Sequence, residues 1–391
     1  MKISLKLKNN NSADFQRHLS ALDGFRACLA LWVYLGHLAY AVGFNNRLLS
    51  MHPLAVDLFM ILSGFLMVRT WKSADKKGLS ATKSGVCFYI GRFFRIAPLY
   101  YFLLIVSALI LTQFAAMHDI ILKTFPPPWV TAGVDYAPHT VWTFTSIEWL
   151  ILHVSFLFGV VPGMEASTPL PDWSLSLEMQ FYLIFPFLLI LFRKLPWLVL
   201  ALLASAIAFF APRLFGNYLD AGVFSHFGQP SLLAYRLNAF FAGMIAAYWL
   251  MEHDLGLALS LKRNLYYGLI AAICVVPLTK LVILAYVLFI LLATGKFTFL
   301  NRIFSIRPLR YLGEISYSIY LCHILILTPI VYWLINTALF VTYTPVVRFL
   351  IAAAIISPLV VAASGALYKL IEKPPVKLGK FLIHKVNASA A

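Results

Sequence analysis

Two ionisable side chains, Arg26 and His37, lie in one hydrophobic run with ten residues between them. Eleven steps of about 100° return to nearly the same face of a helix, roughly 16 Å further along its axis. Because ionisable groups are costly to bury in a membrane and usually face a cavity or a partner, the pair predicts a functional site. The alternative is that Arg26 extends to the cytoplasmic interface and His37 is a satisfied histidine near a helix end.

These side chains suit particular chemistry. A neutral His37, toward the outer half of its helix, could remove a proton from a hydroxyl as a general base, and the alternative is that it acts as a nucleophile and forms a covalent intermediate. Arg92 and Arg95 are three residues apart, so they share a helix face where two guanidiniums could clamp phosphates together with Arg26. Positive residues are also expected at the cytoplasmic mouth of any span, which is the alternative for this pair.

Two acidic residues are further catalytic candidates. Asp57 and Glu178 lie within or at the ends of hydrophobic runs. Either carboxylate could orient His37 and raise its basicity, or pair with Arg26. The alternative is structural pairing with another buried polar group.

Other polar residues have weaker claims to chemistry. Tyr320 and His323 share a helix face and could line a tunnel, although hydrogen bonding between helices explains them as well. Asp23, three residues before Arg26, could neutralise it, and Glu372 is expected to pair with Lys369 at a helix end. The four cysteines have no metal-ligand spacing, so we expect neither a disulfide nor a metal site.

The composition defines the class of protein that must position these residues. Of the 391 residues, 61% are hydrophobic and only 12% are charged, against about 25% charged in average soluble proteins. We therefore expect an all-α polytopic membrane protein with about ten transmembrane helices, each near 20 residues. The runs are 22–43, 54–71, 97–117, 175–193, 196–212, 232–251, 315–336 and 347–371, with a short pair, 264–276 and 281–295, expected to form a tight hairpin.

The distribution of lysine and arginine predicts the orientation. If the N-terminus is cytoplasmic, most of the 31 basic residues fall in inner segments, as the positive-inside rule requires, so both termini are expected in the cytoplasm. The net charge of +16 then reflects topology, and no basic soluble domain suggests nucleic-acid binding. We divide the chain into a cytoplasmic tail (1–20), a membrane domain (21–372) and a second cytoplasmic tail (373–391), with the first span as an uncleaved anchor.

The longest segment between spans, 119–172, is expected on the outer side. A loop of this length is often functional, here as a lid or an acceptor platform. Its tryptophans Trp129, Trp142 and Trp149 could equally anchor it at the membrane interface. Residues 148–161 are apolar but too short to cross, which favours an interfacial or re-entrant helix.

Six ordered blocks together resemble the acyltransferase-3 family of integral membrane acyltransferases. The first contains the family's arginine, ten residues, histidine pattern, and the third its paired arginines. The blocks are LDGFRACLALWVYLGH (22–37), AVDLFMILSGFLM (55–67), GRFFRIAPLYY (91–101), DWSLSLEMQFYLIFP (172–186), LGEISYSIYLCH (312–323) and YKLIEKP (368–374). Any one alone would be a weak signal, whereas six in order are a strong one.

The resemblance implies a ten-helix enzyme that moves an acyl group, most simply acetyl, from cytoplasmic acyl-CoA to a hydroxyl of a cell-envelope or exported carbohydrate. It implies acetyl-CoA as donor substrate, no tightly bound cofactor, and contact with a lipid-linked or surface glycan and membrane lipids, in a bacterial inner membrane. The chain looks like a stand-alone form without a fused esterase-like domain. A transporter or flippase is the alternative, although we see no inverted repeats with matching broken spans.

Overall fold

The computed structural model describes residues 2–75, 80–126, 146–216, 227–254, 260–337 and 339–388. Within these ranges every regular element is a helix, and none is a strand. The prediction of an all-α fold is confirmed. Residues 127–145 contain Trp129 and Trp142, so the predictions made for those two tryptophans lie outside the described residues.

The first half of the chain is dominated by long helices. They are α1 (Lys2–Ala41), α2 (Arg47–Ser50), α3 (Leu54–Asp75), α4 (Ala81–Thr124), α6 (Ile147–Val154), α7 (Trp173–Lys194) and α8 (Trp197–Phe215), with a 3-10 turn at Leu157–Val160. The second half contains more short elements. They are a 3-10 turn at Leu233–Tyr235, α9 (Leu237–Asp254), α10 (Leu261–Val275), α11 (Lys280–Thr294), α12 (Thr298–Phe304), α13 (Arg307–Glu314), α14 (Ser316–Ile335), α15 (Pro345–Leu367), a π turn at Tyr368–Glu372 and α16 (Lys373–Ala388).

Each of the ten predicted spans corresponds to a helix. By length and apolar composition, six helices in the described ranges are able to cross a membrane, or seven if α11 and α12, bent by 100°, count as one broken span. The chain is therefore a polytopic membrane protein, and the number ten stays a prediction. The expected tight hairpin is not formed, because α10 packs mainly on α8 and α9 while α11 packs on α1 and α3.

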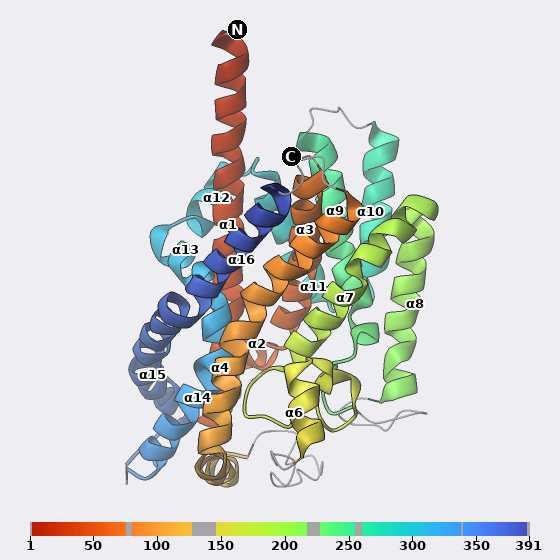
Figure 1. Cartoon of the computed structure of the whole chain (residues 1–391). Coiled ribbons are helices and arrows are strands. Elements are labelled where there is room, and N and C mark those ends of the chain that lie inside the picture. Colours follow the sequence, from red (N-terminus) through yellow and green to blue (C-terminus); the bar gives the residue numbers. More distant parts are fainter. Residues whose placement is uncertain are drawn as a thin grey trace.

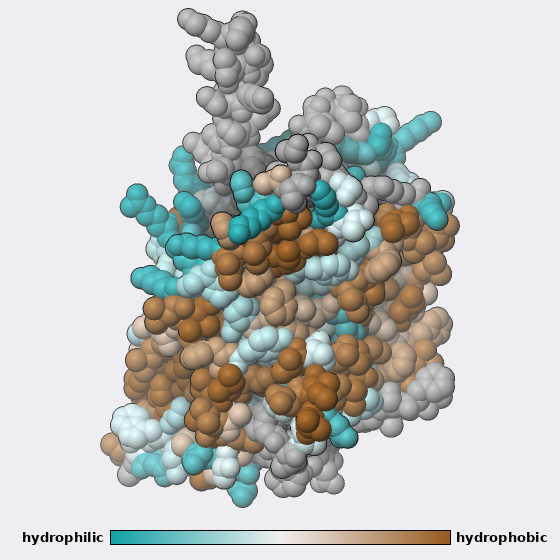
Figure 2. Space-filling model, in the orientation of Figure 1, coloured by the Kyte–Doolittle hydropathy of each residue, from teal (hydrophilic) through white to brown (hydrophobic). Residues whose placement is uncertain are grey.

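Both ends of the chain lie at the same end of the molecule (Figure 1). On the face shown in Figure 2, hydrophilic side chains gather at that end, and a broad apolar band covers the middle. Such a band is the surface that lipid tails require. That both termini lie on one side agrees with the charge distribution, and the assignment of that side to the cytoplasm stays a prediction.

Glycines allow the central helices to touch backbone to backbone. A Cβ added to Gly64 of α3 would lie 2.2 Å from the Phe240 carbonyl oxygen, and one added to Gly243 of α9 would lie 1.8 Å from that of Ile61. Close approach through small residues is typical of packing between membrane helices. Gly24 of α1 meets the Phe304 carbonyl in the same way, at 1.8 Å. This contact fixes the part of α1 that carries Arg26.

The predicted outer segment begins later than expected. Helix α4 continues to Thr124, because residues 118–125, which follow the expected end of the span, contain no proline or glycine before Pro126. Within the segment, α6 is the short helix expected near residues 148–161, and it ends at Val154. Trp149 is only 5% exposed, and its indole nitrogen donates a hydrogen bond to Ser167 Oγ at 3.0 Å. Trp149 therefore packs inside the protein rather than anchoring at a lipid interface.

Candidate active site

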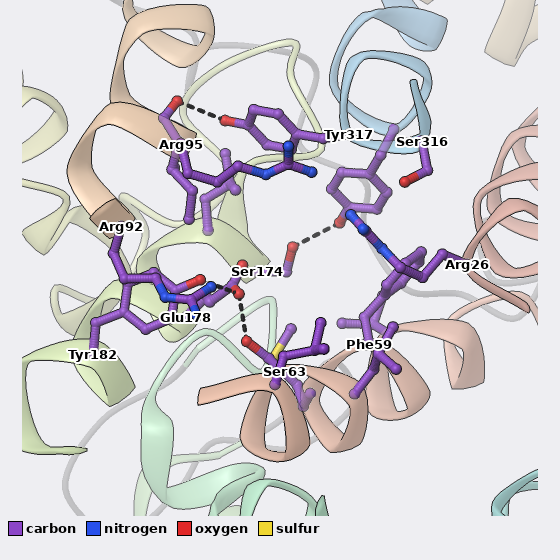
Figure 3. A pocket seen from close by; sticks show the side chains of 17 residues that line it. Arg26, Phe59, Ser63, Arg92, Arg95, Ser174, Glu178, Tyr182, Ser316 and Tyr317 are labelled. Atoms are coloured by element: carbon purple, nitrogen blue, oxygen red, sulfur yellow. Dashed lines mark hydrogen bonds between the residues drawn. The ribbon is translucent and has the colours of Figure 1, made fainter. Parts of the chain in front are cut away.

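A cavity lined by both charged and apolar side chains opens between α1, α3, α4, α7 and α14, and it brings together four of the charged candidates, Arg26, Arg92, Arg95 and Glu178. Its volume is about 220 Å³. Figure 3 shows the guanidiniums of Arg26, Arg92 and Arg95 approaching it from different directions. The lining also contains Val56, Phe59, Met60, Leu62, Ser63, Leu66, Ile96, Ser174, Leu175, Glu178, Tyr182, Ser316, Tyr317 and Tyr320.

The three arginines are held by different contacts. Arg26 forms an ion pair with Asp23 one turn earlier in α1, at 3.7 Å, as the spacing predicted. Arg92 donates a hydrogen bond to Thr70 Oγ1 of α3 at 3.2 Å, and its guanidinium carbon lies 5.5 Å from the centre of the Tyr182 ring. These contacts leave several guanidinium N–H groups for a ligand, because each guanidinium has five.

Arg95 has a strong partner that the sequence analysis assigned differently. Its Nη1 lies 3.0 Å from Glu372 Oε1, and Glu372 Oε2 accepts a hydrogen bond from Ser318 Oγ at 2.8 Å. The expected pairing of Glu372 with Lys369 is wrong. The π turn inserted between α15 and α16 changes the helical phase at Glu372, so its carboxylate is only 1% exposed and points at α4 and α14.

Glu178 contributes an acceptor to the cavity wall. Its Oε1 accepts hydrogen bonds from Ser63 Oγ of α3 and from Tyr182 Oη, each at 2.5 Å. In Figure 3 the carboxylate lies between Ser63 and Arg92. The structure thus places Glu178 with the arginines, and it does not place Glu178 in hydrogen-bond contact with His37.

Asp57 lies outside the cavity lining. Its carboxylate pairs with the guanidinium of Arg236, which immediately precedes α9. Asp57 is 4% exposed, so this is a buried ion pair between α3 and the start of α9. The contact matches the structural alternative for Asp57, and a catalytic role for this residue stays a prediction.

His37 belongs to a second polar group further along α1. Its Nδ1 lies 3.0 Å from Nε2 of His323 in α14. The ring of His52, between α2 and α3, has its centre 4.5 Å from that of His37. We call His37, His52 and His323 the histidine cluster. Gly36 makes room for it, since a Cβ at this position would lie 2.4 Å from the His52 ring.

Tyr320 lies between the cavity and the histidine cluster. It lines the cavity, and its ring centre is 6.3 Å from that of His323, one turn further along α14. Its hydroxyl forms a hydrogen bond with Ser174 Oγ of α7 at 2.8 Å, and Phe59 packs against its ring at 6.2 Å. Of the two residues predicted to line a tunnel, Tyr320 reaches the cavity, while His323 stands behind it and does not line it.

The sequence analysis missed several polar contributors. Ser63, Ser174 and Tyr182 hold or line the cavity, but hydroxyl side chains are frequent in membrane helices and carry no distinctive spacing. His52 lies between two spans. The only sequence feature that could have indicated its contact with His37 is the small residue Gly36 next to His37. In the described part of the chain, no group of three or more His, Cys, Asp or Glu side chains is arranged to hold a metal ion.

This fold and site define a class, that of polytopic membrane enzymes whose basic cavity adjoins a buried histidine. A family model described as an acyltransferase domain matches residues 19–365. The chain belongs to this family, the acyltransferase-3 family, and the resemblance found from the six blocks is confirmed. The match ends before the sixth block, 368–374, so the resemblance of that block stays a prediction.

Named relatives fit the same family. The chain is 26% identical to the peptidoglycan O-acetyltransferase OatA of Listeria monocytogenes over 342 residues, covering 80% of this chain and 50% of that protein. It is 28% identical to the acyltransferase MdmB of Streptomyces mycarofaciens over 201 residues, covering 48% of this chain and 45% of that protein. The chain thus spans about half the length of these relatives. No solved structure matches it significantly.

Proposed function

We propose that this chain is a membrane O-acetyltransferase that takes acetyl from cytoplasmic acetyl-CoA and transfers it to a hydroxyl of a cell-envelope or exported carbohydrate. The observation that carries the proposal is the convergence of Arg26, Arg92 and Arg95 on one cavity. The same helix that supplies Arg26 supplies His37, about 16 Å further along its axis. Both residues belong to the first block of the family resemblance.

The donor is proposed to enter from the end of the molecule at which both termini lie. Guanidiniums bind phosphate oxygens with paired hydrogen bonds, and acyl-CoA carries phosphates on its nucleotide portion. A cavity of about 220 Å³ is small for a whole nucleotide thioester, since pockets for drug-sized ligands run from about 300 to 1,000 Å³. We therefore place the nucleotide at the cavity mouth and the acyl arm inside.

Two glutamates offset part of the positive charge of the three arginines. Glu372 offsets the charge of Arg95, and Glu178 faces Arg92. Arg26 pairs with Asp23 of its own helix, α1, at 3.7 Å. We assign to Arg26 the stabilisation of negative charge on the donor near the membrane interior, because Arg26 lies on the helix that also carries His37.

His37 is proposed to activate the acceptor. The acceptor hydroxyl would attack the thioester carbonyl while the His37 imidazole takes its proton, and the carbon–sulfur bond would break to release the CoA thiolate, which then gains a proton. Tyr320 separates the cavity from His37 in this structure, so the acyl arm must pass this side chain to meet the acceptor. OatA is named for peptidoglycan, which supports an envelope glycan as the acceptor here.

The test is transfer of labelled acetyl from acetyl-CoA to envelope glycans in bacterial membranes that contain the chain at matched expression. Wild-type protein and His384→Ala should label the glycan equally, because His384 is exposed on α16, far along the chain from the cluster. His37→Ala should reduce labelling by at least about 100-fold, the usual contribution of a general base. Equal labelling with His37→Ala would remove His37 from the chemistry, and no labelling by wild type would refute acetyl-CoA as donor.

A further inference from the structure

The hydrogen bonds of the histidine cluster determine which ring nitrogen carries a proton. His37 Nδ1 lies 3.1 Å from the Val33 carbonyl oxygen, and His323 Nδ1 lies 3.0 Å from that of Ile319. A carbonyl oxygen only accepts, so each Nδ1 must carry the hydrogen in these contacts. His323 Nε2 is then unprotonated and accepts, and the His37 Nδ1–H, 3.0 Å away, is directed between two acceptors.

The opposite tautomer would place lone pairs against lone pairs. If His323 Nε2 donated to His37 Nδ1, both Nδ1 atoms would lack hydrogens and would face the carbonyls of Val33 and Ile319. Buried polar atoms without hydrogen-bond partners are strongly disfavoured. The arrangement therefore leaves the basic lone pair of His37 on Nε2. In the proposed reaction this atom takes the proton from the substrate hydroxyl.

We propose that His323 is a positioning residue that holds His37 in its Nδ1–H tautomer and stabilises the imidazolium formed when Nε2 takes a proton. The inference rests on the proposed function of His37 as general base. His323 occupies the place that a carboxylate has in a serine hydrolase triad. It touches no reacting atom, and it acts through its hydrogen bond to His37.

The surroundings explain why an imidazole fills this place. His323 is 0% exposed and belongs to α14, a helix that is long and apolar enough to cross a membrane. A carboxylate there would be a buried charge, whereas a neutral imidazole accepts the hydrogen bond without that desolvation penalty. The nearby Tyr34 does not compete for His323 Nε2, because its hydroxyl bonds Ser357 Oγ at 3.0 Å.

His52 supports the same geometry without adding charge. Burial lowers the pKa of His52 to about 4, and its Nδ1 donates to the Leu49 carbonyl oxygen at 3.0 Å. Its ring lies against His37 at a centre-to-centre distance of 4.5 Å. His37 is thus fixed by His323 through a hydrogen bond and by His52 through ring contact.

The kinetic experiment compares His323→Leu with His323→Gln in purified protein in lipid nanodiscs, with His384→Leu as the control. Leucine removes the acceptor, whereas the glutamine side chain has a carbonyl oxygen that can replace Nε2. We expect His323→Leu to lower kcat by about 100-fold with the KM for acetyl-CoA within about threefold of wild type. His323→Gln should recover at least about tenfold of that loss.

Two kinetic results would overturn the inference. One is a folded His323→Leu protein whose kcat equals that of His384→Leu. The other is equal loss in His323→Leu and His323→Gln, which would assign the effect to packing rather than to the acceptor.

A spectroscopic experiment separates this inference from the proposed function. In ¹⁵N spectra of histidine-labelled protein, the His37 signals are assigned by their loss in His37→Gln. We expect His37 to carry its hydrogen on Nδ1 and to show coupling across the hydrogen bond to His323 Nε2, which His323→Leu removes. This pattern is expected even if wild-type protein transfers no acetyl, whereas a hydrogen on His37 Nε2 would refute the inference whatever the activity.

Discussion

At the scale of single residues, the cavity depends on how buried charges are paired. Glu372 is 1% exposed and has two partners, Arg95 and Ser318, from two other helices. A buried carboxylate whose cationic partner is removed is left uncompensated, which typically destabilises a protein by about 3–5 kcal/mol. Arg95 therefore has a structural role, the pairing of Glu372, in addition to the donor-binding role proposed above.

A double substitution can separate the structural role of Arg95 from its proposed role in donor binding. Arg95→Ala should destabilise the protein by about 3 kcal/mol, because the buried Glu372 carboxyl loses its cationic partner. Adding Glu372→Gln should restore most of the thermal stability, since an amide tolerates burial with Ser318 as a partner. The KM for acetyl-CoA should stay raised in the double variant. Recovery of both stability and KM would mean that Arg95 serves Glu372 alone.

Gly36 is predicted to act only through His52. A Cβ at position 36 would lie 2.4 Å from the His52 ring, so Gly36→Ala must displace that ring from His37. We expect kcat to fall by about tenfold, with the effect of Gly36→Ala absent in a His52→Ala background, since residues in contact give non-additive effects. Additive losses in the double variant would show that the alanine disturbs α1 itself.

The sequence identified the charged site residues because a charge in an apolar run stands out. Arg26, Arg92, Arg95 and Glu178 were all found in this way, and all line the cavity. The ion-pair partner of Arg95 was not predictable, because Arg95 and Glu372 are separated by most of the chain. Asp57 shows the limit of this approach. An acidic residue in an apolar run can either line a cavity or form a buried ion pair, and Asp57 forms the ion pair with Arg236.

At the scale of elements, the start of α7 holds a buried carboxylate outside the membrane-spanning segment. Asp172 Oδ2 accepts hydrogen bonds from Thr168 Oγ1 at 2.8 Å and from Tyr100 Oη at 3.3 Å. Burial raises the pKa of Asp172 to about 7, and these two hydrogen bonds offset only part of that effect. The folded protein therefore binds a proton at this site at a pH where the unfolded chain has released it.

This proton predicts how stability depends on pH. Between the ordinary pKa of 3.8 and the folded value of about 7, the unfolded chain loses the proton first, so stability contributed by Asp172 falls as pH rises through this window. The loss amounts to at most about 4 kcal/mol. Asp172→Asn, which imitates the protonated acid, should remove this part of the slope when thermal unfolding is compared at about pH 5 and about pH 8. An unchanged slope would assign it to other groups.

The existence of the helices was predictable, whereas their ends and special turns were not. Apolar runs of about 20 residues predict helices because the backbone must satisfy its own hydrogen bonds in lipid. The boundary placed at residue 119 was wrong, since α4 continues to Thr124 with no local stop signal. The π turn at Tyr368–Glu372 also has no sequence signal that we could find, because the contacts that accompany it, with Arg95 and Ser318, come from distant helices.

At the scale of the whole molecule, the arginines and the histidine cluster lie at different positions along the length of the helix bundle. Arg92 and Arg95 belong to the first half of α4, and α4 begins near the end of the molecule that carries both termini (Figure 1). The histidine cluster lies further along α1, at the end of that helix away from the N-terminus. If the termini are cytoplasmic, as the charge distribution predicts, the proposed donor and the proposed acceptor are expected to approach the protein from opposite sides.

This division makes activity depend on the sidedness of the membrane. In inverted vesicles, where the cytoplasmic face is outward, added acetyl-CoA should reach the arginines and label glycan at the rate seen in permeabilised vesicles. In sealed right-side-out vesicles, the charged donor cannot cross the bilayer, so labelling should fall to the level of the His37→Ala variant and return on permeabilisation. Arg92→Ala should raise the KM for acetyl-CoA in inverted vesicles, because one of the guanidiniums at the cavity mouth is lost. Equal labelling in sealed vesicles of both orientations would place the donor site on the outer side and reverse the proposed route of the acyl group.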